Sequence, residues 1–438
     1  MTEGKGQRLY QKAKKLIPGG TMLLSKRPEM FLPEHWPAYF QKSKGCNVWD
    51  LEGNKLLDMF IMGIGTNSLG YGNEAVDNAV KKVIDNGNMS TLNAPEEVEL
   101  AERLVELHPW GDMVRFARTG GEANSIAIRI ARAASRRDKV AICGYHGWHD
   151  WYLSANLGEN DGLDGHLIPG LEPAGVPKNL KGSVIPFNYN DLEEITSIVH
   201  NNPDLGVIKM EVSRNIGPNP GYLEGIRKLC DKHNLVLIFD ECSSGFRETF
   251  GGLHKKYNVE PDMCMFGKAM GNGYAVTAVL GKRSVMEAAQ KTFISSTFWT
   301  ERIGSAAALA TLQEMEKQKS WDFITKQGTK ITNKWNSLAK NHNLKLKTAG
   351  LPALTSFSID STDWLKYKTY ITQEMLKKGI LAGNIVYVCT KHTDEVIKRY
   401  FENFDPILAK IVEFENGELS IDEHLDGPVC HGGFKRLN

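Results

Sequence analysis

The sequence predicts an α/β fold built on a mainly parallel central sheet. Between about residues 75 and 310, short runs of Val, Ile and Leu alternate with stretches of helical periodicity. These runs are apolar throughout, which is typical of strands that are covered by helices on both faces. The strand-like runs are residues 113–117, 139–143, 183–187, 205–212, 235–241, 262–267 and 277–281, and helical periods such as 121–135 and 221–234 lie between them.

The two ends of the chain differ from this middle part. A helix is predicted over residues 5–16, and a hairpin over 47–59, where apolar residues flank a Glu-Gly-Asn turn. After residue 325, further helices accompany a single strand-like segment. We therefore predict a large domain over residues 66–325 and a smaller α+β domain made of residues 326–438 together with the N-terminal segment 1–65.

The composition of the chain disfavours nucleic acid and membranes as binding partners. The chain has 438 residues, of which 41% are hydrophobic and 24% charged, and its net charge of +1 creates no field that would attract nucleic acid or an anionic membrane. No apolar run approaches the roughly 18 residues that a membrane span needs. The N-terminal residues 1–15 lack the apolar centre of a signal peptide. We expect a cytoplasmic protein whose partners are small molecules.

Neither a disulfide framework nor a metal site is predicted. The seven cysteines are an odd number and form no CxxC pair. His146 and His149 are three residues apart, but no third ligand has a suitable spacing.

Two charged side chains follow separate strand-like runs. Asp240 ends the apolar run 235–239, and Lys268, 28 residues later, follows the run 263–266 beside glycines. Ligands of such sheets bind where the strands end, and a buried carboxylate there requires a partner. Taken singly, Asp240 could cap a helix or pair with Arg247, and Lys268 could be an exposed loop lysine. Together they predict one crevice containing a carboxylate and an amine of lowered pKa.

A glycine-containing turn follows the first strand-like run. Thr119, Gly120 and Gly121 lie where a helix begins, and a helix start offers free N–H groups and a positive dipole to an anion. The alternative is a capped helix start without a ligand. The spacings of a P-loop and of a dinucleotide fingerprint are absent from this turn. Tyr145, after the next run, could stack on a planar ligand or pack in an ordinary interface.

Several segments together resemble those of class III aminotransferases, which are pyridoxal-phosphate (PLP) enzymes of fold type I. The resemblance is greatest to the glutamate-1-semialdehyde aminomutase branch and extends from about residue 16 to about residue 400. Its most specific parts are FDECSSGFR (239–247) and FGKAMGNG (266–273), which are specific through their joint spacing. The segments RTGGEANSIAIRIARAAS, YHGWHD and STFWTERIGSAAALATL add to it. The resemblance implies PLP as the cofactor and no metal.

The resemblance also implies roles for single residues. Lys268 falls on the lysine that forms a Schiff base with the cofactor, and Asp240 falls on the carboxylate that keeps the ring nitrogen protonated. Thr119, Gly120 and Gly121 fall on the phosphate-binding turn. The other cofactor-binding positions are Tyr145, which stacks on the ring, Cys242, which packs against it, Glu211, near the substrate, and Thr297, which reaches the phosphate from the partner subunit. A homodimer with shared sites is therefore expected.

The sequence departs from the family pattern at three places. Gly121 replaces a threonine that is common there, which removes one hydroxyl from the phosphate site. Glu211 is followed by Val212 rather than by proline, and residues 62–65 lack the tryptophan that semialdehyde aminomutases usually have. Because Lys268 and Asp240 are present, we infer a changed substrate more than a changed reaction.

The leading hypothesis is therefore a transaminase that moves an amino group from an amino-acid donor to an aldehyde or ketone, with a sugar-derived carbonyl among the candidates. The alternative is a true glutamate-1-semialdehyde 2,1-aminomutase. A non-catalytic binding protein of the same fold is disfavoured by the presence of Lys268 and Asp240. A dehydrogenase is disfavoured by the missing dinucleotide fingerprint.

Overall fold

The computed structural model describes residues 4–158, 162–166, 169–213 and 215–433. Its contacts divide the chain into two compact units. The small unit comprises residues 1–73 and 323–438, and the large unit comprises residues 74–322. All residues that the sequence assigns to the cofactor lie in the large unit.

A seven-stranded sheet forms the centre of the large unit, in the order β4-β10-β9-β8-β7-β5-β6. Strand β10 runs antiparallel to both of its neighbours, β4 and β9, and the other neighbouring pairs are parallel. The strands are β4 Met113–Ala117, β5 Lys139–Cys143, β6 Val184–Pro186, β7 Leu205–Met210, β8 Val236–Asp240, β9 Met263–Phe266 and β10 Thr277–Gly281. The predicted α/β fold with a mainly parallel sheet is thus confirmed.

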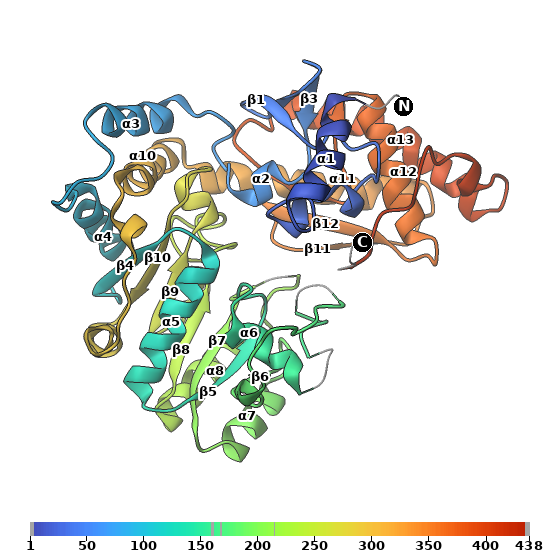
Figure 1. Ribbon diagram of the computed structural model, residues 1–438. Helices are drawn as coiled ribbons and strands as arrows, with labels where there is room; N and C mark the ends of the chain where they lie inside the picture. The colour runs from blue at the N-terminus through green and yellow to red at the C-terminus, as the bar shows by residue number, and fades with distance from the viewer. Residues whose placement is uncertain (1–3, 159–161, 167–168, 214, 434–438) are drawn as a thin grey trace. The chain divides into compact units, whose positions relative to one another are not determined.

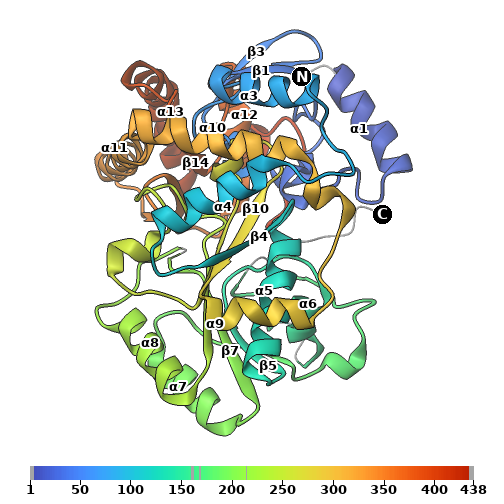
Figure 2. The same cartoon turned by 90° about the vertical axis from the view of Figure 1, so that its left-hand side faces the viewer.

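The central strands are apolar because helices cover both faces of the sheet. Every residue of β7, β8, β9 and β10 is buried. Helix α5 (Gly120–Ser135) lies across one face, where Ile126 and Ile130 enter the same core as Val140 and Val207 (Figure 1). Helices α7 (Leu192–Asn201) and α8 (Tyr222–His233) cover the other face (Figure 2). This arrangement leaves the ends of the parallel strands as the place where polar side chains gather.

Further helices complete the large unit. Helix α4 Pro95–Leu107 packs against β4, helix α10 Arg302–Gln318 packs against α4, and helix α3 Glu74–Asp85 packs against α10. Short ones are α6 Asp150–Leu153, α9 Arg283–Met286 and the 3-10 turns η3 Ser154–Leu157, η4 Lys178–Leu180, η5 Leu253–Tyr257, η6 Lys268–Gly271, η7 Glu287–Lys291 and η8 Thr297–Thr300.

The connection between β8 and β9, which the structure describes throughout, contains one short 3-10 turn, η5, and no α-helix. Gly245, Gly251 and Gly252 disfavour an α-helix there, and the Glu241 carboxylate binds the backbone N–H groups of Leu253 and His254.

The small unit contains two antiparallel-rich sheets, of order β1-β2-β3-β13 and β11-β12-β14. Its strands are β1 Phe40–Lys44, β2 Asn47–Asp50, β3 Lys55–Asp58, β11 Leu346–Ala349, β12 Leu354–Ile359, β13 Ile380–Leu381 and β14 Ile385–Tyr387. Its helices are α1 Lys5–Leu16, α2 Met62–Gly65, α12 Trp364–Lys377, α13 Asp394–Glu415, η1 Leu24–Lys26, η2 Pro28–Met30 and η9 Ile421–Glu423, with α11 Ser320–Asn341 beginning in the large unit. The predicted hairpin is β2 and β3. In the part of the chain that the structure describes, no helix has both the length and the apolar character required to cross a lipid bilayer.

Candidate active site

The predicted site residues follow the ends of neighbouring strands in the large unit. β8 and β9 are parallel and adjacent, with Asp240 paired to Met265. Lys268 begins η6 directly beyond β9, and its φ of 39° is unusual for a residue with a side chain. Such left-handed backbone is costly and tends to persist at functional positions. The other site residues follow their strands in the same way: Thr119 after β4, Tyr145 after β5, Glu211 after β7 and Cys242 after β8.

Lys268 is positioned by a residue of the β8–β9 connection. Its Nζ donates a hydrogen bond to Ser243 Oγ at 2.6 Å. Burial lowers the pKa of the Lys268 amine, and the nearby Arg247 guanidinium lowers it further, against the opposing effects of Glu211 and Asp240. An amine of lowered pKa has more of the neutral form that acts as a nucleophile and as a proton acceptor. Sequence reasoning did not identify Ser243, which is an ordinary small polar residue of a loop.

Asp240 is a buried carboxylate with three hydrogen-bonding or charged partners. Its side chain is 5% exposed. Oδ2 lies 2.9 Å from His146 Nδ1 and 3.6 Å from Lys209 Nζ, and Oδ1 accepts from Cys242 N at 3.2 Å. Burial alone would raise the pKa of Asp240, but Lys209, His146 and the Cys242 N–H together hold it well below its usual range. Asp240 is therefore ionised and suited to a cationic ring nitrogen.

Lys209 is a member of the site that sequence reasoning missed. It lies in β7, its side chain is 0% exposed, and its Nζ is 3.0 Å from Met265 Sδ. Burial lowers the pKa of Lys209, whereas the Asp240 carboxylate raises it. The signal was present in the sequence, since Lys209 is the only basic residue in the apolar run 205–212.

The glycine turn forms the N-terminus of α5. Thr119 caps the helix, and its side chain and that of Glu122 bond reciprocally to each other's backbone N–H. Among the described residues, the N–H groups of Gly120 and Gly121 have no hydrogen-bond partner. A β-carbon on Gly120 would meet no atom within 4 Å. Two N–H groups without a partner at a helix N-terminus suit a phosphate group.

Glu211 and Tyr145 are in contact at the ends of β7 and β5. Glu211 Oε2 accepts a hydrogen bond from Tyr145 N at 3.1 Å. The Tyr145 ring is 37% exposed and packs edge-to-face on Tyr152, with 6.1 Å between ring centroids. Burial raises the pKa of the Cys242 thiol well above its usual value, so Cys242 stays a neutral, weakly polar group.

Thr297 is the predicted residue that the structure does not bring to the others. It is exposed and begins η8. Its segment is attached to the start of α5, because Arg118 Nη2 donates to Trp299 O at 2.9 Å and Trp299 Nε1 donates to Glu122 Oε1 at 3.3 Å. No hydrogen bond joins Thr297 to another predicted site residue in the ranges that the structure describes.

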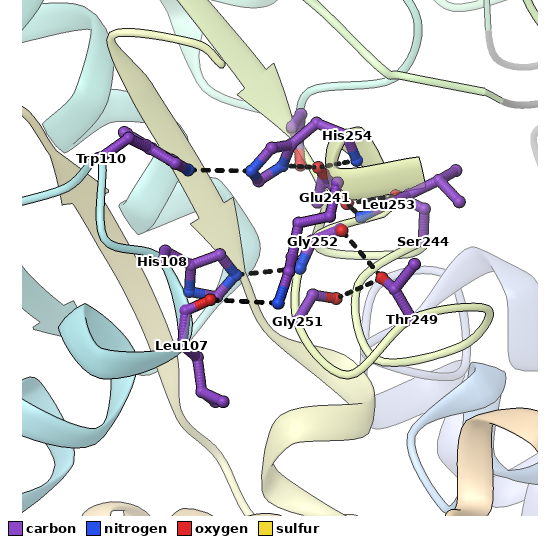
Figure 3. Close-up of polar contacts among 12 residues, drawn as sticks. Leu107, His108, Trp110, Glu241, Ser244, Thr249, Gly251, Gly252, Leu253 and His254 are labelled. Carbon is purple, nitrogen blue, oxygen red and sulfur yellow. Dashed lines mark hydrogen bonds and ion pairs between the residues drawn. The ribbon is translucent and has the colours of Figure 1, made fainter. Parts of the chain in front are cut away.

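A second buried carboxylate lies next to Asp240 and has a different environment (Figure 3). Glu241 accepts from Leu253 N, from His254 N at 3.1 Å and from His254 Nδ1 at 2.6 Å. Trp110 Nε1 donates to His254 Nε2 at 2.9 Å. Glu241, His254 and Cys264 are close enough to hold a metal ion. However, Nδ1 of His254 donates and Nε2 accepts, so the ring has no lone pair left for a metal. We interpret this cluster as structural.

Comparison with known families settles the relationship. The model of the class III aminotransferases matches residues 33–408. The chain belongs to the class III aminotransferase family. Class III aminotransferases are PLP enzymes, and the strand-end amine, the buried carboxylate and the open helix N-terminus fit that cofactor.

Three curated relatives align with most of this class III chain. A 3-aminobutyryl-CoA aminotransferase of Cloacimonas acidaminovorans is 32% identical over 417 residues, which are 92% of this chain and 96% of the relative. A glutamate-1-semialdehyde 2,1-aminomutase of Syntrophobacter fumaroxidans is 33% identical over 368 residues, 81% of each chain. A 2'-deamino-2'-hydroxyneamine transaminase of Streptomyces kanamyceticus is 29% identical over 379 residues, 84% of this chain and 90% of the relative.

Solved structures confirm the fold type. The FumI protein of Sphingopyxis sp. MTA144, solved with PLP, has a TM-score of 0.84 at 22% identity, with 94% of this chain and 98% of that chain covered. At this identity the match establishes a shared fold. The class III aminotransferase therefore has the fold type I architecture that the sequence predicted.

Proposed function

We propose that this protein transfers an amino group from an amino-acid donor to an aldehyde or ketone acceptor, with PLP held between Lys268 and Asp240. The observation that supports this proposal most is the pair itself. An amine of lowered pKa and an ionised buried carboxylate follow two adjacent parallel strands. A structural ion pair alone would need neither the left-handed backbone of Lys268 nor the open N–H groups of α5.

The chain's own residues would divide the work as follows. PLP, when bound, supplies a conjugated electron sink for the charge that develops at the substrate's α-carbon. Asp240 Oδ2 or Oδ1 holds a proton at the ring nitrogen, and His146 fixes the carboxylate through Nδ1. Lys268 Nζ removes the α-proton and later returns it. Gly120 and Gly121 bind the phosphate through their N–H groups, while Thr119 keeps the helix start in shape.

Further support for an intermolecular reaction comes from two relatives. The Cloacimonas protein is named as an aminotransferase of 3-aminobutyryl-CoA. The Streptomyces protein is named as a transaminase of 2'-deamino-2'-hydroxyneamine. Transfer between two molecules therefore occurs among the names of relatives at this degree of identity, beside the aminomutases. We propose a polar carbonyl compound as the acceptor and include sugar-derived and acyl-CoA compounds in its test.

Glutamate-1-semialdehyde 2,1-aminomutase is the second candidate, because relatives of that name are 27–36% identical to this chain. An aminomutase needs no external donor. Purified protein loaded with PLP or pyridoxamine phosphate would be given the semialdehyde alone. We expect no repeated turnover, and continuous formation of 5-aminolevulinate would establish the aminomutase instead.

The transaminase is tested by a donor screen. Protein loaded with PLP is mixed with single donors, including glutamate, alanine, 3-aminobutyryl-CoA and an amino sugar, and the visible absorption of the lysine-linked cofactor is followed. We expect one class of donor to bleach this absorption and an acceptor to restore it. Lys268→Ala should remove the lysine-linked absorption altogether. A wild-type protein that remains colourless with added PLP would contradict the proposal.

We also propose a cytoplasmic homodimer in which Thr297 reaches the phosphate site of the partner subunit. Thr297 lies beside Phe298, which is 67% exposed, and near Phe293, which is 86% exposed. Apolar side chains exposed to this extent are typical of a surface that another subunit covers. Seven free cysteines suit a reducing compartment. Analytical ultracentrifugation should give twice the chain mass of 48.9 kDa, and Thr297→Ala should weaken PLP binding.

A further inference from the structure

An exposed tryptophan lies beside the N-terminus of α5. Trp148 is 67% exposed, and its ring packs on His149 with 4.4 Å between centroids. Within the described ranges, its indole N–H has no hydrogen-bond partner. A large aromatic side chain with an unused donor at a functional surface is a candidate for ligand contact.

The loop that contains Trp148 is held against the glycine turn. His149 Nδ1 lies 2.6 Å from Ser125 Oγ and 2.8 Å from Gly121 O, both in α5. Gly147 has a φ of 99°, and a β-carbon on it would lie 3.0 Å from Gly121 Cα. Glycine at positions 121 and 147 therefore permits the close approach of loop and helix. This close approach fixes the position of the Trp148 backbone relative to the start of α5.

The indole nitrogen lies where a side chain at position 121 would extend. A β-carbon on Gly121 would be 3.4 Å from Trp148 Nε1 and 3.2 Å from His149 Cε1. A threonine at this position would direct its hydroxyl toward the anion that the helix start binds. With glycine there, Trp148 Nε1 is the nearest side-chain nitrogen to the position that the β-carbon of such a residue would take.

We propose that Trp148 is a further phosphate ligand of the cofactor, whose indole N–H takes the place of a hydroxyl at position 121. This inference rests on the proposed function, since it needs the phosphate of PLP at the N-terminus of α5. A hydrogen bond to a charged oxygen is stronger than a neutral one, so its loss should be measurable in binding alone.

The test compares two forms of the cofactor in the full-length apoprotein. Trp148→Phe keeps an aromatic six-membered ring and removes the N–H together with the five-membered ring. We expect PLP to bind this variant about tenfold more weakly than it binds the wild type, whereas pyridoxal, which has no phosphate, binds both equally. Trp321→Phe is the matched control, because Trp321 stacks on Phe250 far along the chain from the turn, and it should change neither value.

A rescue separates hydrogen bonding from packing. Gly121→Thr in the wild type should weaken PLP binding, because the new side chain meets Trp148 and His149. In the Trp148→Phe background, where the contact with His149 remains but the indole is gone, the same Gly121→Thr should recover part of the lost affinity, since the hydroxyl replaces the N–H. Circular dichroism confirms that each variant is folded.

Two results would overturn the inference while leaving the proposed function intact. One is an unchanged affinity of Trp148→Phe for PLP. The other is an equal loss of affinity for PLP and for pyridoxal, which would mean that the Trp148 ring stacks on the pyridine ring and does not bind the phosphate. If the wild type itself does not bind PLP through Lys268, both proposals fail.

Discussion

Asp240 and Glu241 are consecutive buried carboxylates at the end of β8, and their surroundings differ in kind. Glu241 is 0% exposed and accepts three hydrogen bonds from Leu253 and His254 of its own connection, with Ser244 Oγ at 3.4 Å (Figure 3). Asp240 is 5% exposed and is balanced by the titratable groups of His146 and Lys209, which lie in other parts of the chain.

The difference shows how one dipeptide serves both structure and chemistry. Donors of a single loop saturate Glu241, so its charge is used to fix the β8–β9 connection, which also contains Ser243 beside Lys268. The charge of Asp240 is met mainly by the His146 and Lys209 side chains, which come from other parts of the chain. A carboxylate whose donors all come from its own connection fixes that connection, whereas one balanced by a buried lysine of another strand suits a cofactor.

The largest effect is expected from substitution of Asp240, and it concerns catalytic activity. Asp240→Ala should lower kcat/KM by about 10³–10⁴-fold, because no group then holds a proton at the ring nitrogen. Asp240→Asn keeps the shape of the side chain and should be similarly inactive. Steady-state kinetics with the donor found in the screen measures the loss. Activity within tenfold of the wild type in Asp240→Asn would show that the carboxylate's charge is not needed.

The second largest effect is expected from substitution of Glu241, and it concerns the free energy of unfolding. Glu241→Ala leaves the buried N–H groups of Leu253 and His254 without an acceptor, which should destabilise the protein by about 3–5 kcal/mol. Urea unfolding followed by fluorescence measures this change. Glu241→Gln retains one acceptor oxygen and should lose less. If Glu241→Ala unfolds at the wild-type urea concentration but is inactive, the two carboxylates have been assigned the wrong way round.

His108, which is hydrogen-bonded to the β8–β9 connection that Glu241 fixes, should make the stability of the protein depend on pH. His108 Nδ1 donates to Leu104 O and Nε2 accepts from Gly252 N, and burial lowers the pKa of His108 to about 4. The unfolded chain binds this proton below its ordinary pKa of 6.5, whereas the folded chain does not. Stability should therefore fall by roughly 3 kcal/mol as the pH drops from 6.5 to 4.

His108→Gln provides the control for this dependence. The variant should have a lower stability at pH 7 and a flatter decline toward pH 4. Part of the decline will remain, because burial also lowers the pKa of His392 in the small unit to about 4. An equally steep decline in His108→Gln would show that protonation of His108 does not cause the pH dependence.

The smallest effect is expected from substitution of Lys209, the buried cation beside Asp240, and it concerns stability with and without PLP. Lys209→Met removes one cation from the carboxylate, so the apoprotein should lose about 1–2 kcal/mol. A protonated ring replaces the missing charge, so the loaded protein should lose less. PLP should therefore raise the unfolding temperature of Lys209→Met more than that of the wild type. Lys282→Met, which breaks the outlying pair with Asp262, should show the wild-type shift, and an equal shift in both variants would contradict the exchange of cations.

The strands of the large unit were predictable because burial on both faces leaves continuous apolar runs. The prediction extended β7 and β8 too far, to Val212 and Glu241, because an apolar run does not mark where hydrogen bonding to the neighbouring strand ends. The nearness of Asp240 and Lys268 followed from two adjacent strand ends. The membership in class III followed from the spacing of two motifs.

The partners of these residues were not predictable from the sequence. His146 lies 94 positions from Asp240, and their contact depends on the order of β5, β7 and β8 in the sheet. The contact of Lys209 depends on the register between β7 and β8. The close approach of Gly121 and Gly147 depends on a loop conformation, which no periodicity encodes.

We propose Lys268 as the lysine that is joined to PLP, and borohydride mapping tests this assignment most directly. Reduction of the loaded protein makes the carbon–nitrogen bond to the cofactor permanent, and mass spectrometry of the peptides locates it. We predict a phosphopyridoxyl group on the peptide that contains Lys268 and an unmodified Lys209 peptide. Modification of Lys209, of several exposed lysines, or of none would contradict the site described above.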